Sequence, residues 1–302
     1  MILALLVASA AILWYGRRSS RALAAQVAAK LVPGADGIIP GAEPISLDAS
    51  GSRAVLLLHG FGDTPQTLRY VAAALHADGY TVRAPLLPGH GRTLAAFRAT
   101  RAKQWIAAAR EAYEEMCLAH GPSPVVGLSM GGALAIVLAA ETPTMPALAL
   151  IAPYVSMPRR ARFVARFHPV WSLITPYFRS GGDRSIHDET ERARNRAYGV
   201  LTPALLFELS RVVRRVQVSL PRVKSPTLVI HGLNDERIPP DAAAREYARL
   251  GASDKRLIWL DQGGHVLTVD HGRDRVIELV KDWLARHPAG VAAHSPARPA
   301  VT

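Results

Sequence analysis

Cysteine is almost missing from this chain, which has one, Cys117, among 302 residues. A single cysteine cannot form an intramolecular disulfide, and a cysteine-based metal site is excluded as well. The sequence also lacks metal-type histidine spacings, helix-turn-helix patterns and platforms of interleaved aromatic and basic residues. We therefore expect neither a metal ion nor nucleic acid as a ligand.

Acidic residues are scarce too, 24 against 36 lysines and arginines, which gives a formal net charge of +12. An anionic membrane surface is a partner that fits this balance. General disorder is excluded, because hydrophobic residues make up 49% of the chain. A length of 302 residues is enough for one large domain with a sizeable core.

One long apolar run lies at the N-terminus, where residues 2–15 are almost wholly apolar and end in Trp14 and Tyr15. The run is shorter than the roughly 20 residues that span a bilayer. Positive charge follows it at Arg17, Arg18 and Arg21, whereas a secretory signal carries its charge before the apolar stretch. We predict an uncleaved membrane anchor over residues 1–18, with the globular domain facing the cytoplasm. A signal peptide and an exported protein are the alternative.

Short apolar segments alternate with helical patterns along most of the chain, which predicts βαβ units and a mostly parallel sheet flanked by helices. After a linker helix over residues 19–41, we expect this α/β core to comprise residues 42–153 and 224–287. The expected strands are 53–58, 80–84, 124–128, 147–151, 226–230 and 256–260. The expected helices include 65–78, 104–120 and 273–286.

Residues 154–223 interrupt this alternation. Their apolar residues recur at helical spacing, and arginines are frequent among them. We predict a helical insertion that caps the core. Residues 288–302 are rich in proline and alanine, and we expect a disordered tail there.

A serine lies between two glycines where an expected strand meets an expected helix. Gly127-Leu128-Ser129-Met130-Gly131 follows the G-x-S-x-G pattern, directly after an apolar strand and before an apolar helical run. Such a turn lifts the serine hydroxyl clear of the sheet and points a helix N-terminus at it. A side chain at either glycine would collide with the neighbouring strand or helix. The pattern predicts a nucleophilic Ser129.

A serine needs a base to remove its proton and an acid to orient that base. In a parallel sheet, both should follow the carboxyl ends of later strands. Asp235 follows the strand 226–230, and His265 follows the strand 256–260 through a Gly-Gly pair. We predict His265 as the base and Asp235 as the acid, with Asp261 and Asp270 as rivals for the acid.

Acyl transfer also requires donors for the oxyanion of the transition state. The backbone N–H of Met130, directly after the serine, is one expected donor. The loop His59-Gly60-Phe61-Gly62 follows the first expected strand, and the N–H of Phe61 is the other.

Five segments together resemble the carboxylesterase and monoacylglycerol lipase group of the α/β hydrolases. They are 57–62, 85–91, 127–132, 231–235 and 263–265. The order Ser129, Asp235, His265 is also the order of this superfamily. The resemblance implies an α/β-hydrolase fold with a lid-like cap, acyl-ester substrates, no metal and no cofactor.

The resulting hypothesis is a serine esterase or lipase that cleaves acylglycerols or simple acyl esters through an acyl-enzyme. We expect Phe163, Phe167 and Trp171 of the cap to bind the acyl chain. Thioester or amide hydrolysis and acyl transfer are alternatives on the same triad, and an inactive membrane-tethered binding module is a second alternative. The sequence makes no prediction of the oligomeric state.

Overall fold

A central sheet organises the computed structural model, which describes residues 2–181 and 185–288. Within these residues, seven strands pair in the order β1-β3-β2-β4-β5-β8-β9. Only β1 is antiparallel to its neighbour, so the prediction of a mostly parallel sheet is confirmed. The strands are β1 (Ile45–Leu47), β2 (Ala54–Leu58), β3 (Thr81–Ala84), β4 (Val125–Leu128), β5 (Leu148–Ile151), β8 (Thr227–Gly232) and β9 (Lys255–Leu260).

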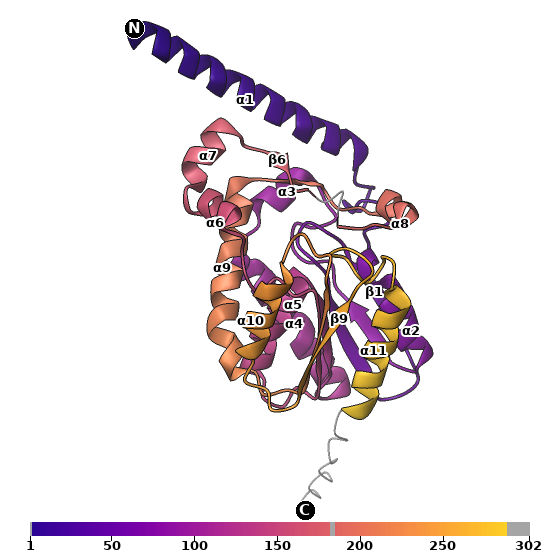
Figure 1. Cartoon of the computed structure of the whole chain (residues 1–302). Helices are drawn as coiled ribbons and strands as arrows, with labels where there is room; N and C mark the ends of the chain where they lie inside the picture. The colour runs from indigo at the N-terminus through magenta and orange to yellow at the C-terminus, as the bar shows by residue number, and fades with distance from the viewer. Residues whose placement is uncertain (1, 182–184, 289–302) are drawn as a thin grey trace, which may run out of the picture.

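Helices cover both faces of the sheet, so its middle strands are buried throughout (Figure 1). Strands buried on both sides are continuous apolar runs, which is why β2, β4 and β5 were visible in the sequence. One face packs against α4 (Ala102–His120) and α5 (Met130–Glu141), the other against α2 (Arg69–Ala77) and α11 (Arg273–Arg286). The 3-10 helix η1 (Pro65–Leu68) leads into α2.

Several short elements went unpredicted. They are β1, α3 (Leu94–Ala99), α10 (Pro240–Ala248) and the 3-10 helix η3 (Leu220–Arg222). Elements of three to nine residues show too few turns or alternations for a periodic pattern to stand out.

A cap lies over the end of the sheet where the parallel strands terminate (Figure 1). Its helices are α6 (Arg159–Arg166), α7 (His168–Ile174), α8 (Glu189–Arg194) and α9 (Pro203–Ser219). The cap also contains an antiparallel pair, β6 (Phe178–Arg179) with β7 (Val200–Leu201), although the sequence showed only helical spacing there. Strands of two residues carry no readable alternation.

The N-terminal segment differs from the expected anchor and separate linker helix. One helix, α1 (Ile2–Lys30), crosses above the cap and does not break near residue 18 (Figure 1). Ser20 Oγ donates to Tyr177 O at 2.6 Å and accepts from Tyr177 N at 2.6 Å, which fastens α1 to the cap. The chain leaves the helix before residue 41, and Leu31 and Ile39 are already part of the core.

None of the helices in the described part of the chain is both long enough and apolar enough to cross a membrane. The expected disordered tail, residues 288–302, lies outside the described residues except for residue 288.

Candidate active site

Ser129 occupies the turn between β4 and α5, with φ 53° and ψ −115°. A positive φ is strained for a residue with a side chain, and the glycines around it allow the turn to close. A Cβ on Gly127 would lie 2.5 Å from Gly131 O, and one on Gly131 would lie 1.9 Å from Leu58 O. Backbone cannot yield at such distances, so these two positions require glycine.

The structure brings the three predicted triad residues together. His265 Nε2 lies 2.8 Å from Ser129 Oγ, and His265 Nδ1 lies 2.7 Å from Asp235 Oδ2. All three residues are buried. With a proton on Nδ1 donated to the carboxylate, Nε2 is left to accept the serine proton.

The surroundings of Asp235 keep its carboxyl group ionised. Its second oxygen, Oδ1, accepts the backbone N–H of Arg237 at 2.7 Å and that of Ile238 at 3.0 Å. Burial acts to raise the pKa of Asp235, but His265 and these N–H donors outweigh it and the pKa is lowered. Asp235 is therefore equipped to stabilise an imidazolium at His265.

Three other histidines near the site are buried and hydrogen-bonded, and each has a lowered pKa. Burial lowers the pKa of His59 to about 4, that of His90 well below its usual value, and that of His231 as well. His59 Nε2 accepts from Leu87 N at 3.0 Å, and Nδ1 donates to Gly60 O at 2.9 Å. These neutral rings brace the loops and are not placed to act as the base.

The expected oxyanion donors belong to the residue after Ser129 and to a loop close to it. Met130 is the first residue of α5, so its N–H has no acceptor inside the helix. The loop carrying Phe61 approaches the serine closely, since a Cβ on Gly60 would lie 3.4 Å from Ser129 Cβ. Among the described residues, the Phe61 N–H donates no hydrogen bond. Both amides are thus available to a ligand at the serine.

Of the two rivals for the acid, Asp270 has a different task and Asp261 is exposed on the surface. The buried Asp270 carboxylate accepts Gly264 N at 2.6 Å and His271 N at 2.8 Å. It also accepts His187 N and Asp188 N from the cap, at 2.9 and 2.8 Å. Asp270 thereby ties the loop before His265 to the cap.

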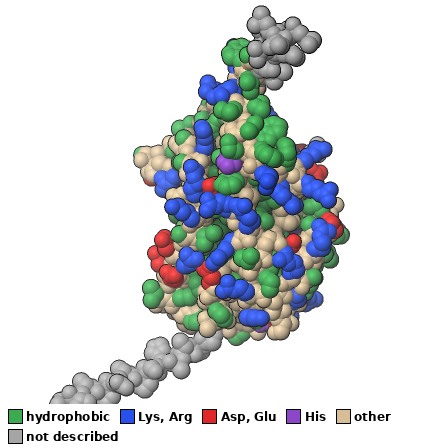
Figure 2. Space-filling model, turned by 90° about the vertical axis from the view of Figure 1, so that its left-hand side faces the viewer, with side chains coloured by type: hydrophobic (Ala, Val, Ile, Leu, Met, Phe, Trp, Pro, Cys, Tyr) green, Lys and Arg blue, Asp and Glu red, His purple; other side chains and the backbone are tan. Residues whose placement is uncertain are grey.

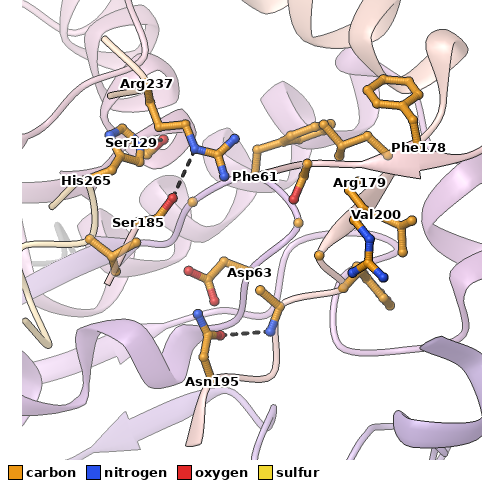
Figure 3. A pocket seen from close by; sticks show the side chains of 18 of the residues that line it. Phe61, Asp63, Ser129, Phe178, Arg179, Ser185, Asn195, Val200, Arg237 and His265 are labelled. Atoms are coloured by element: carbon orange, nitrogen blue, oxygen red, sulfur yellow. Dashed lines mark hydrogen bonds between the residues drawn. The ribbon is translucent and has the colours of Figure 1, made fainter. Parts of the chain in front are cut away.

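The triad opens into a pocket of about 650 Å³ between the core and the cap (Figure 3). Its walls come from the loops after β2, β8 and β9, the turn after β4, the cap, and the C-terminal half of α1 with the residue that follows it. The residues of this N-terminal segment that line it are Leu23, Gln26, Val27 and Lys30 of α1 and, directly after the helix, Leu31. Sequence reasoning missed this contribution, because α1 precedes every motif and its apolar residues show no relation to the site.

The three cap residues predicted to bind the acyl chain do not line this pocket, and that prediction is corrected. Phe163 is 55% exposed and Phe167 is 43% exposed. Their rings cluster on the outside of the cap, with centroids 4.9 Å apart and Trp171 6.4 Å from Phe163. Helical spacing identifies which residues share a face, but the face of α6 that meets the cavity carries Ala161 and Val164.

Polar residues that no motif indicated also line the pocket, among them Asp63, Arg179, Ser185, Asn195 and Arg237. They belong to loops and short cap elements without a recurring pattern, so the sequence carried no signal for them. In the described ranges, no cluster of three or more His, Cys, Asp and Glu residues could hold a metal ion.

Comparisons with known proteins agree with this geometry. The sequence matches the Hydrolase_4 family, described as serine aminopeptidase, S33, over residues 50–272. It is 30% identical over 251 residues to a thermostable monoacylglycerol lipase of Bacillus sp. (strain H-257), covering 83% of this chain and 97% of that protein. It is 28% identical over 240 residues to a carboxylesterase of Bacillus subtilis (strain 168), covering 78% and 94%.

A solved structure is also similar. It comes from work on LipS and LipT, two metagenome-derived lipolytic enzymes, and superposes with a TM-score of 0.76 at 29% identity. The match covers 83% of this chain and 100% of that one.

Proposed function

Because this chain belongs to the Hydrolase_4 family (serine aminopeptidase, S33), we propose that it is a serine hydrolase that cleaves carboxylic esters. Acylglycerols and simple acyl esters are the proposed substrates, by similarity to the monoacylglycerol lipase and the carboxylesterase. The observation that carries the proposal is the chain of contacts at 2.8 and 2.7 Å from Ser129 through His265 to Asp235, at the wall of a pocket between the core and the cap.

In the proposed acylation step, Ser129 Oγ attacks the acyl carbonyl carbon while His265 Nε2 takes its proton. The electron pair of the carbonyl moves onto oxygen, and the N–H groups of Phe61 and Met130 hold the oxyanion. Asp235 stabilises the imidazolium. The tetrahedral intermediate then expels the alcohol, which takes the proton from His265.

Deacylation repeats these steps with water as the nucleophile. His265 removes a proton from water, the hydroxide attacks the acyl-enzyme carbonyl, and the carboxylic acid leaves as Ser129 regains its proton. Each oxyanion donor stabilises such a transition state by about 3 kcal/mol. Besides the ester and water, the steps use only side chains and backbone amides of this chain.

The charge of the pocket disfavours aminopeptidase activity, although the family description names it. An aminopeptidase binds a positively charged N-terminus, whereas five lysine and arginine residues line this pocket against two acidic residues. Repulsion among like charges in a partly closed site weakens the binding of a cation. Thioester hydrolysis and acyl transfer use the same triad, and substrate comparison separates them from ester hydrolysis.

The test is active-site labelling combined with a substrate panel. A fluorophosphonate probe should label the wild type and fail to label Ser129→Ala. Hydrolysis of p-nitrophenyl esters and monoacylglycerols should exceed that of matched amides and acyl-CoA thioesters, and should fall by at least about 10⁴-fold in Ser129→Ala. Labelling that persists in Ser129→Ala would overturn the mechanism, and absence of turnover on every ester would favour a binding module.

We also propose that the protein works at a membrane surface. Two groups of large apolar side chains are exposed on α1 and on α6–α7, and arginines lie among them. Figure 2 shows the face that carries the cap, with Lys and Arg side chains interspersed among hydrophobic ones. The exposed apolar residues are Leu13, Trp14, Tyr15, Phe163, Phe167, Val170 and Leu173. Apolar side chains with adjacent arginines favour an anionic lipid interface.

Vesicle sedimentation tests the membrane proposal. The wild type should pellet with vesicles containing anionic lipid and less so with zwitterionic ones, and Phe163→Ser/Phe167→Ser should pellet less. Val218→Ser, at an exposed apolar position outside this surface, is the matched control. Equal sedimentation of all variants would overturn the proposal. The cytoplasmic orientation stays a prediction from the arginines after residue 16, and cell fractionation with protease protection checks it.

A further inference from the structure

An arginine lies beside the triad without belonging to it. The backbone N–H of Arg237 donates to Asp235 Oδ1 at 2.7 Å, and its side-chain Nε donates to Ser185 Oγ at 3.0 Å. Ser185 O in turn accepts at 2.9 Å from the N–H of Val266, the residue after His265. Arg237 is therefore held between the loops that carry the acid and the base of the triad.

The Arg237 side chain faces the pocket. It is partly buried, and Figure 3 shows it reaching into the pocket from the side of Ser129 and His265. Across the described residues it forms no ion pair with a carboxylate, and the Nε bond to Ser185 is its one side-chain hydrogen bond. Burial lowers the pKa of Arg237, whereas the nearby carboxylates of Asp235 and Glu236 act to raise it. Since neither of these carboxylates is in direct contact with the partly desolvated guanidinium, an anion that enters the pocket can bind its remaining N–H donors.

Most of the other charged side chains in the lining are also cationic. Four exposed cationic side chains surround the pocket: Lys30, Arg160, Arg179 and Arg192. The acidic side chains in the lining are Asp63 and Glu236. Burial raises the pKa of Asp63 to about 7, so this carboxyl group is only partly ionised at neutral pH. A concave site with excess positive charge attracts anions and raises their local concentration.

From this arrangement we propose that Arg237 binds an anionic group of the substrate, so that the preferred substrates are acyl esters that also carry a phosphate or carboxylate. The planar guanidinium group can donate two parallel hydrogen bonds to either a phosphate or a carboxylate, and its hydrogen bond to Ser185 fixes its orientation. The exposed cations attract the anion, and Arg237, next to the triad, positions the ester. The proposal rests on the proposed ester hydrolysis and specifies the substrate class of the same site.

Matched pairs of soluble esters test the proposal, and the two members of each pair differ by one anionic group. For the alcohol side, 1-decanoylglycerol is compared with 1-decanoylglycerol 3-phosphate. For the acyl side, dimethyl decanedioate is compared with its monomethyl half-ester. All are assayed without vesicles and below the concentration at which they aggregate. The quantity measured is the ratio of kcat/KM for the charged ester to that for its neutral partner.

In the wild type the ratio should exceed one for at least one pair, which also identifies the side of the ester that bears the anion. In Arg237→Gln that ratio should fall by at least about tenfold, mainly through KM, because a charge-assisted hydrogen bond is lost. Arg237→Lys, which keeps the charge without the fork, should lie between the two. Arg256→Gln removes an exposed charge on β9 outside the pocket and should leave the ratio unchanged.

Equal losses on charged and neutral esters in Arg237→Gln would show that Arg237 only supports the fold of the loops, and would overturn the proposal. Ratios below one for both pairs in the wild type would overturn it as well. Failure of ester hydrolysis itself is separate, because the neutral esters then give no turnover in any variant that retains Ser129.

Discussion

At the scale of single residues, two buried aspartates outside the triad have pKa values that are shifted in opposite directions. Asp63 accepts a backbone hydrogen bond from the N–H of Thr64 at 2.9 Å, and burial raises its pKa to about 7. Burial also acts to raise the pKa of Asp270, but backbone donors such as Gly264 and His187 outweigh it and the pKa is lowered. The number of N–H groups around each carboxylate accounts for the difference.

Asp63→Asn should stabilise the protein at alkaline pH and not at acidic pH. The folded protein binds the Asp63 proton up to about pH 7, whereas the unfolded chain releases it near 3.8. The ionised carboxyl group therefore costs stability that grows as the pH rises from about 4 to about 7, by up to about 4 kcal/mol. Thermal unfolding from pH 4 to 8 should show a gain in Tm for Asp63→Asn that increases with pH. Asp261→Asn, an exposed control, should show no such trend.

Asp270→Asn should destabilise the protein and lower its activity together. The asparagine amide has only one acceptor oxygen. Its NH₂ group would then face backbone N–H groups that donate to Asp270 Oδ2 in the wild type, including that of Gly264. Losing charge-assisted hydrogen bonds in a buried site costs about 2–4 kcal/mol. Denaturant unfolding measures the stability, and kcat should fall because Gly264 precedes His265. Full activity with unchanged stability would show that the loop holds its place without this carboxylate.

At the scale of elements, α1 is both a structural strap and a wall of the pocket. Leu23 and Val27 pack against the main core cluster and line the cavity, yet they precede residue 50, where the family match begins. The shape of this pocket therefore depends on a segment outside the shared family region. Substrate size is the property that such a wall controls.

Val27→Trp should shorten the range of accepted acyl chains. The added ring occupies cavity volume at the α1 wall, so long-chain esters should lose space, whereas acetate esters, which need little of the cavity, should not. The ratio of kcat/KM for decanoate to that for acetate esters should fall by about tenfold or more. Ala25→Trp, on an exposed position of the same helix, is the matched control. An unchanged ratio in Val27→Trp would mean that the chain extends elsewhere in the pocket.

At the scale of the whole molecule, the chain has a net charge of +12, and many of its cationic side chains lie in two places that the proposed function uses. Several cations lie on the lining of the one site where chemistry is proposed, and others accompany the exposed apolar residues of the cap and α1. The excess of positive charge would thus attract an anionic substrate to the pocket and an anionic lipid surface to the cap and α1.

Salt should weaken hydrolysis of anionic esters selectively. Raising the ionic strength from about 0.05 M to about 0.5 M shortens the screening length to a few ångströms, which screens the exposed pocket cations. Under these conditions kcat/KM for the anionic ester should fall several-fold, while that for the neutral partner should stay within about twofold. A parallel decline on both esters would indicate a general effect of salt on the protein.

Much of the fold and the identity of the superfamily could be predicted from the sequence, and the fold class and the family resemblance are confirmed. Buried strands such as β2 and β4 are continuous apolar runs, and Gly127 and Gly131 stand where a Cβ would strike backbone. Burial of a strand and close approach of the backbone each restrict the residue types at particular positions, so both can be recognised in the sequence. Short elements such as β1 and the β6–β7 pair leave none, because tertiary packing and not periodicity stabilises them.

The sequence by itself determined the parallel strands of the sheet, the serine turn and the order in which Ser129, Asp235 and His265 follow their strands. Only the tertiary structure decided what surrounds them. It turned Phe163 and Phe167 outward, brought α1 to the pocket and placed Arg237 beside the triad. The physical reason is that strand burial and tight turns restrict residues that are close together in the sequence. The wall of a pocket, in contrast, is built from segments far apart in the sequence, and the packing of the whole protein determines which of their faces meet.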